Sequence, residues 1–238
     1  MDTLAGGTNA ILILLLGIGV VGAAIVSLAL ARRRKMALAR TIAGVAAAGL
    51  ALYAGGVIAV SAASTEQTLS PGDTKWFCGF YLDCHLGMSV DRTETATTIP
   101  AATGDVKANG VFHIVTLELH NSARNQALDM TLYQPVAKVI DASGREYSRS
   151  SSAEAALAKG GTIPSPLGTE TRVTHDPTLV RIVFDLPWDA KAPRLMVTEG
   201  WVVDRAIEFG LIGDENSVFH RKTLLALDGS EARVSMER

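Results

Sequence analysis

The chain has 238 residues, and its 24 acidic and 22 basic side chains nearly balance. The hydrophobic residues, 48% of the total, are concentrated near the N-terminus, where residues 10–31 and 41–64 hold no charged side chain. Residues 65–238 hold 17 basic and 23 acidic side chains, a formal charge of −6. Because this part is negative and lacks basic runs, we exclude nucleic acid as a partner.

Each apolar stretch is long enough to cross a bilayer, which needs roughly 20 apolar residues. We therefore predict an N-terminal hairpin over residues 1–64, with transmembrane helices over residues 10–31 and 41–63. Before the first stretch the charged side chain is Asp2, whereas a signal peptide begins with a positive segment. We expect the first helix to be retained.

The segment between the two helices, residues 32–40, sets the expected topology. Short loops rich in Lys and Arg stay in the cytoplasm. We therefore expect a multi-pass protein of a bacterial inner (cytoplasmic) membrane, with the N-terminus and everything after Ser64 on the periplasmic, extracytoplasmic side. The residues that determine this topology are Arg32, Arg33, Arg34, Lys35 and Arg40.

Small residues recur every four positions in both predicted helices, which places them along one face of each helix. Such faces let helices approach closely in lipid. Two interpretations follow: the two helices pack against each other, or one face docks onto a different membrane protein. Neither helix holds a charged side chain, so we do not expect a transporter or channel. The small residues are Gly19, Ala23, Ser27 and Ala31, then Ala43, Ala47, Ala51, Gly55, Ala59 and Ala63.

A polar linker is predicted over residues 65–75, and the chain's two cysteines follow it. The topology places Cys78 and Cys84 on the oxidising side of the membrane, and their spacing can close a small loop, so we predict a disulfide. Copper is the alternative, because these thiols with His85 and Met88 are soft ligands that copper selects. Two helices followed by an external β domain also resemble cytochrome c oxidase subunit II. That family has three residues between its cysteines, whereas this chain has five.

Aromatic residues gather close to the cysteines and again near residue 201. They can fill the core of the external domain, lie at the membrane interface or form a docking surface. The candidate interface residues are Trp76, Phe77, Phe80, Tyr81 and Trp201.

Short strand-like runs with frequent turns occupy residues 76–228, and a C-terminal tail follows over residues 229–238. A helix is predicted over residues 151–159, where a serine precedes an alanine-rich run that two glycines end. A second short helix is predicted over residues 202–209. The pattern favours an immunoglobulin-like β-sandwich with one or two short helices. The predicted strands are residues 111–120, 137–141, 171–174, 179–185, 194–198 and 218–227.

One series of motifs extends this interpretation. A strand and an asparagine-containing turn over residues 110–121 precede the hydrophobic run 137–141, which leads into the sequence D-A-S-G-R-E-Y at residues 141–147. With F-D-L-P at residues 184–187, the series resembles immunoglobulin-like domains of unknown function on bacterial membrane-anchored chains and lipoproteins. The resemblance covers about residues 85–200. It implies a sandwich and an extracytoplasmic location, and no known chemistry.

The sequence holds no phosphate-binding loop, dinucleotide fingerprint, nucleophile elbow or zinc-protease spacing. We therefore expect neither an enzyme nor a cofactor. The predicted function is that of a non-catalytic accessory or stabilising subunit of a larger bacterial membrane complex, respiratory or photosynthetic. Its expected partners are other integral membrane protein subunits and the lipid bilayer. The alternatives are a copper-binding electron-transfer subunit and a stand-alone envelope sensor or ligand-binding module.

Overall fold

The computed structural model describes all residues except 1–2, 78–83, 102–103, 126–127, 160–163 and 228–238. The chain divides into two compact units. Among the described residues, the first unit holds the N-terminal part up to Thr65 together with Val202–Arg221, and the second unit holds the rest. Residues 202–221 therefore group with the hairpin, although the sequence placed them in the β domain.

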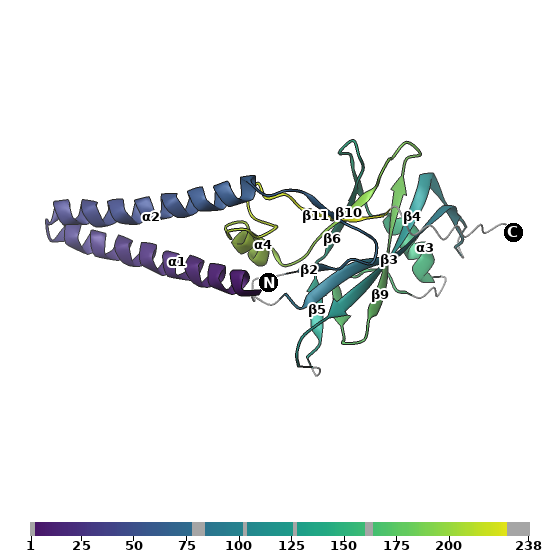
Figure 1. Ribbon diagram of the computed structural model, residues 1–238, viewed down its shortest axis with the longest axis horizontal. Helices are drawn as coiled ribbons and strands as arrows, with labels where there is room; N and C mark the ends of the chain where they lie inside the picture. Colours follow the sequence, from purple (N-terminus) through teal and green to yellow (C-terminus); the bar gives the residue numbers. More distant parts are fainter. Residues whose placement is uncertain (1–2, 78–83, 102–103, 126–127, 160–163, 228–238) are drawn as a thin grey trace. The chain divides into compact units, whose positions relative to one another are not determined.

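The first unit is built on two long apolar helices, α1 (Thr3–Arg32) and α2 (Met36–Ala62), which run side by side in opposite directions (Figure 1). Ile11–Arg32 and Met36–Ala62 are long and apolar enough to cross a membrane. Large apolar side chains on both helices are exposed, among them Leu52 (78%) and Val45 (69%). Exposed apolar surface of this extent is rare on soluble proteins and common in lipid, so the two helices indicate membrane anchoring.

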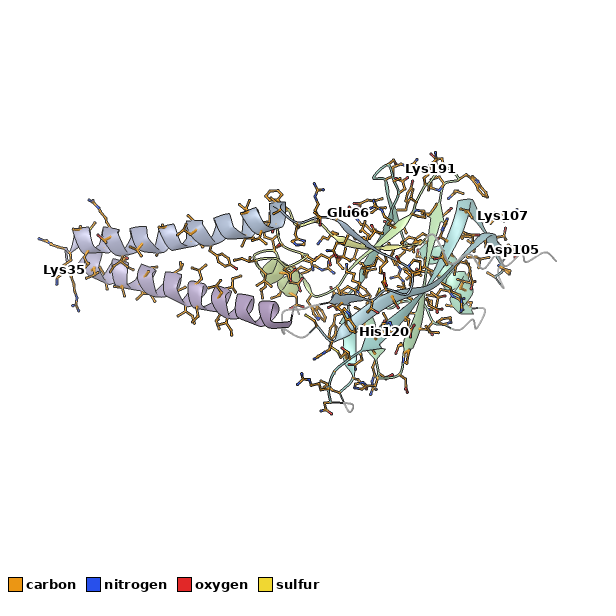
Figure 2. The ribbon with its side chains drawn as sticks, viewed as in Figure 1. Lys35, Glu66, Asp105, Lys107, His120 and Lys191 are labelled. Carbon is orange, nitrogen blue, oxygen red and sulfur yellow. The ribbon has the colours of Figure 1, made fainter. Side chains whose placement is uncertain are left out.

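The turn between the helices is shorter than the predicted loop 32–40. Helix α1 includes Arg32 and α2 already begins at Met36, so Arg40 lies inside α2. The extension has a simple cause, because Met, Ala, Leu and Arg are all strong helix formers. Lys35 lies at the closed end of the hairpin, where its side chain points away from both helices (Figure 2).

The second unit is a mainly-β sandwich with a short helix. One sheet has the strand order β1-β11-β10-β6-β7, a second sheet has the order β2-β3-β4-β9, and β5 pairs with β8. The strands are β1 (Gln67–Leu69), β2 (Lys75–Phe77), β3 (Leu86–Ile99), β4 (Val106–Asn121), β5 (Met130–Tyr133), β6 (Val136–Ile140), β7 (Glu146–Ser148), β8 (Glu170–Val173), β9 (Thr178–Leu186), β10 (Arg194–Thr198) and β11 (Thr223–Ala226). The prediction of apolar helices followed by a β-sandwich is confirmed.

The core of the sandwich lies between the two larger sheets. Alternate residues of β4 (Val115, Leu117 and Leu119) are inaccessible and share one cluster with Leu195 of β10 and Leu225 of β11. Strands β3, β4 and β9 pair in antiparallel fashion, so their alternating side chains add to the same cluster. A slip of one residue would turn these side chains out of the core, which fixes the register.

Helix α3 (Ser151–Lys159) covers a second apolar cluster, in which its Ala153 and Ala156 pack with Phe112 of β4. The Glu154 carboxylate ties the helix to its surroundings. It accepts hydrogen bonds from Nε and Nη2 of Arg149, both at 2.8 Å, and from the backbone N–H of Val183 at 3.1 Å.

We expect Glu154→Gln to lower the free energy of unfolding by about 2 kcal/mol, because it removes the charge from a largely buried ion pair that also holds a backbone N–H. Urea unfolding of the full chain in mild detergent, followed by tryptophan fluorescence, measures the change. Glu146→Gln is the matched control, since its pair with Lys138 is exposed (51% and 37%) and contributes only about 0–1 kcal/mol. Equal losses in the two variants would contradict the role given to Glu154.

Candidate functional site

The faces that α1 and α2 turn toward each other are not formed by the predicted small-residue stripe of α2. On α1 the partly covered positions include Leu16, Val20, Ala23 and Ser27. On α2 they are Ile42, Ala46, Gly49, Tyr53 and Gly56, with Ala39, Val57 and Ser61 buried. Ala23 and Ser27 thus lie on the inner face of the hairpin.

The α2 stripe instead lies on the opposite side of its helix. Ala47, Ala51, Gly55 and Ala59, which we call the outer ridge, are all exposed. A Cβ atom added at Gly55 would meet nothing within 4 Å, and the same holds at Gly19 of α1. Of the two interpretations of these small residues, packing within the hairpin does not use the outer ridge.

The inner faces also leave space between the helices. An apolar groove of about 390 Å³ is lined by both helices, with Leu16, Gly19 and Ala23 on one side and Ile42, Ala46 and Gly49 on the other. The groove therefore lies where small residues of α1 and α2 meet.

The segment Val202–Arg221, which we call the docked segment, lies alongside the last turns of α2. It begins with α4 (Val202–Glu208), beside the open end of the hairpin (Figure 1). The Tyr53 hydroxyl donates to the carbonyl of Gly210 (2.8 Å), and the buried Ser61 hydroxyl bonds the Ser217 hydroxyl (2.9 Å).

Further contacts continue in the same order along α2. A Cβ added at Gly56 would lie 3.9 Å from Ile212, and one added at Gly213 would lie 3.8 Å from Val60. At the end, the Arg221 backbone N–H donates to the Ser64 hydroxyl (2.8 Å). The docked segment thus runs along α2 from the level of Tyr53 to the first residues beyond the end of the helix.

The aromatic candidates separate into core and surface residues. Phe77 is 7% exposed and belongs to the core, whereas its neighbour Trp76 is 43% exposed. Trp201 is 45% exposed and its ring lies 5.7 Å from that of Tyr133, measured between centroids. Phe80 and Tyr81 lie outside the described residues.

The candidate copper ligands do not form one set in the described part of the chain. The Met88 side chain is wholly buried in the sandwich core, and Nδ1 of His85 lies 3.2 Å from the Ser122 hydroxyl. Within the described ranges no three His, Cys, Asp or Glu side chains are placed to hold a metal ion. Cys84 precedes β3, but Cys78 lies outside the described residues, so the disulfide stays a prediction.

The D-x-x-G-x-x-Y motif forms a densely bonded polar cluster. The buried Asp141 carboxylate accepts hydrogen bonds from the Ser143 N–H (2.8 Å) and hydroxyl (2.6 Å), and from Nε (2.7 Å) and the N–H (3.0 Å) of Arg145. The Tyr147 hydroxyl adds a fifth, at 3.0 Å. The bonds from Ser143, and then those from Arg145 and Tyr147, hold the Asp141 pKa well below its ordinary value.

Gly144 completes this motif, because its φ of 83° lies in the left-handed region that favours glycine. The motif therefore shapes the turn between β6 and β7. A carboxylate that accepts five hydrogen bonds has little capacity left to take up a proton from a substrate. We therefore assign Asp141 a structural role.

Comparison with known proteins gives structural likeness alone. No family model and no curated protein matches the chain. It is similar to the yjhA protein from Bacillus subtilis (12% identity over 67% of this chain and 98% of that one, TM-score 0.41). It is also similar to the secreted protein MPT63 from Mycobacterium tuberculosis (14% identity, 60% and 95% covered, TM-score 0.39). A third such structure is an uncharacterized β-sandwich protein from Clostridium difficile 630 (9% identity, 69% and 96% covered, TM-score 0.35).

Proposed function

We propose that this chain is a non-catalytic accessory subunit of a larger bacterial membrane complex, respiratory or photosynthetic, which it joins through helix–helix contacts in the bilayer. The observation that carries the proposal is the outer ridge of α2. Its four small residues are exposed and lie on the side away from α1, and a Cβ added at Gly55 would meet nothing within 4 Å. In lipid, a ridge of this kind lets the backbone of another helix approach closely.

The proposed topology has the hairpin crossing the inner membrane twice, with the β domain on the extracytoplasmic side. It is supported by the five cations Arg32, Arg33, Arg34, Lys35 and Arg40, all within or beside the closed turn. Figure 2 shows Lys35 at that end. Positive residues next to membrane helices favour the cytoplasmic side.

We further propose that the β unit has an immunoglobulin-like topology. The support is the strand order, in which β6, β10 and β11 are neighbours in one sheet and β3, β4 and β9 in the other. In immunoglobulin domains the third, sixth and seventh strands lie in one sheet, and the first, second and fifth strands lie in the other. Here β6, β10 and β11 would take the places of the third, sixth and seventh strands, and β3, β4 and β9 those of the first, second and fifth. A disulfide between Cys78 and Cys84 fits an extracytoplasmic domain.

The test is co-purification of the native chain in mild detergent, followed by blue native electrophoresis. We expect the chain to migrate in a large complex with partners at fixed stoichiometry. Gly55→Leu, on the outer ridge, should lower recovery of the partners roughly tenfold, because a large side chain keeps the helices apart. The matched control Gly22→Leu, on α1, also adds its side chain to open space and should leave recovery unchanged.

Two results would contradict this proposal. A single band of monomer size would favour a stand-alone envelope sensor or binding module. Partner loss that is equal in Gly55→Leu and Gly22→Leu would show that the outer ridge has no special role, even if the chain belongs to a complex.

A further inference from the structure

The depth of the docked segment can be measured along α2. Tyr53, which bonds the carbonyl of Gly210, precedes the last residue of α2 by nine residues, which is about 14 Å of helix axis. Because the 27 residues of α2 span about 40 Å and a bilayer core is about 30 Å thick, this contact lies roughly 9 Å below the core surface if the helix is centred.

A contact with α1 supports the same depth. A Cβ added at Gly210 would lie 3.5 Å from Cδ1 of Ile13. Ile13 belongs to the apolar part of α1 that is long enough to cross a membrane. The docked segment therefore lies next to both helices at a level where neither has a charged residue.

Part of the backbone of the docked segment is bonded within the segment. The N–H of Leu211 donates to the carbonyl of Glu208 (3.0 Å), and the N–H of Val218 donates to the carbonyl of Phe209 (3.1 Å). The Glu208 carboxylate is 4% exposed and accepts a hydrogen bond from the Asn216 amide (2.9 Å). Irregular backbone is tolerated at membrane depth where it is buried against protein, and the contacts with Tyr53, Ser61 and Ile13 cover one side of this segment.

Several large apolar side chains of the docked segment are uncovered. Val202 (77%), Val203 (67%), Phe209 (57%) and Phe219 (70%) are all exposed. Exposed Phe and Val at the level of a bilayer surface are typical of segments that lie in the membrane interface.

We infer that the docked segment is a re-entrant, lipid-embedded element that enters the leaflet at the open end of the hairpin and contacts acyl chains through Phe209, with Phe219 nearer the headgroups because its neighbours bond Ser61 and Ser64 at the end of α2. The inference goes beyond the proposed function but rests on the same membrane-spanning hairpin. The segment holds four acidic residues (Asp204, Glu208, Asp214, Glu215) and two basic ones (Arg205, Arg221), a formal charge of −2. Apolar contact, rather than attraction to anionic headgroups, is therefore the source of its lipid binding.

Photocrosslinking of the full chain tests this inference. Benzoylphenylalanine is placed at Phe209 or Phe219, the protein is reconstituted into neutral phosphatidylcholine vesicles with labelled acyl chains, and lipid adducts are counted after illumination. Leu52 of α2 (78% exposed) is the lipid-facing reference, and Trp188 of the β unit (72% exposed) is the matched exposed control. We expect adducts at Phe209 comparable to those at Leu52, fewer at Phe219, and few at Trp188.

Each other outcome has a distinct meaning. Adducts at Leu52 without adducts at Phe209 and Phe219 would overturn the inference and leave the hairpin in place. Labelling at Trp188 as strong as at Phe209, or labelling at Phe209 only after anionic lipid is added, would also overturn it. A lack of adducts at Leu52 itself would instead contradict the membrane-spanning hairpin on which the proposed function rests.

Discussion

Replacing Gly110 by alanine is expected to lower the melting temperature of the chain by roughly 5–10 °C. A Cβ at this position would lie 2.2 Å from the carbonyl oxygen of Leu186 and 2.7 Å from Cα of Pro187. Both are backbone atoms, so β4 and β9 must separate locally to admit the methyl group. That movement also strains the bonds from the N–H groups of Asn109 (2.9 Å) and Gly110 (3.1 Å) to the Asp185 carboxylate.

Thermal unfolding of the full chain in detergent, followed by circular dichroism in the β region, measures this effect. Gly87→Ala is the matched control. A Cβ at Gly87 would also lie too close to neighbouring atoms, at 2.6–2.9 Å, but these atoms belong to the side chains of Thr74 and Trp76. Trp76 is 43% exposed and can swing into solvent, so we expect less than half the loss seen for Gly110→Ala. A larger loss at Gly87 would refute the argument from backbone contact.

The elements that the sequence predicted best carry local signals. Helix α3 has the predicted bounds because a serine run begins it, alanines favour it and Gly160 follows it. Strand β10 also has the predicted bounds, and β4 and β9 were found within a few residues because their β-branched and apolar residues are dense.

Strands whose residues carry no clear local pattern were missed. The sequence of β3 (Leu86–Ile99) mixes Ser, Thr, Asp, Arg and Glu with few apolar residues, yet Ser89 and Thr93 are buried, because β3 lies between β2 and β4. β1 was read as part of a linker, because three residues that pair in parallel with β11 give no local signal.

The hairpin unit likewise combines local signals, which the sequence reveals, with contacts between distant residues, which it does not. Spacing of four identified the small residues, but which face meets α1 depends on both helices, and the outer ridge points away from α1. The predicted strand over residues 218–227 begins only at Thr223, because Ser217 and Arg221 bond residues of the hairpin, Ser61 and Ser64, about 156 positions earlier. No local pattern encodes partners at that distance.

The pH dependence of stability is expected to change when Asp141 is replaced by asparagine. The donors around Asp141 keep its folded-state pKa well below the ordinary value of 3.8, so near pH 4 the unfolded chain binds more protons than the folded chain. Stability must therefore rise with pH through this interval. The contribution of Asp141 is complete above about pH 5 and is lost progressively as the pH falls toward its folded-state pKa.

Melting temperatures of the two proteins at pH 7, 5, 4 and 3 test this linkage. Asp141→Asn should melt roughly 5 °C below the unchanged chain at pH 7, since an NH2 group replaces an acceptor oxygen and faces groups that are themselves donors, and the difference should begin to narrow as the pH falls from 4 to 3. Asp189→Asn is the matched control: its carboxylate contacts Nη1 of the same Arg145 at 3.0 Å but is 69% exposed, so its removal should change little at any pH. Curves for Asp141→Asn that stay parallel to the unchanged chain from pH 7 to 3 would mean that the lost stability comes from the shape of the turn between β6 and β7. A difference that narrows below pH 4 would assign it to the carboxylate charge, and this part of the D-x-x-G-x-x-Y motif would then be a charge-dependent turn rather than a steric one.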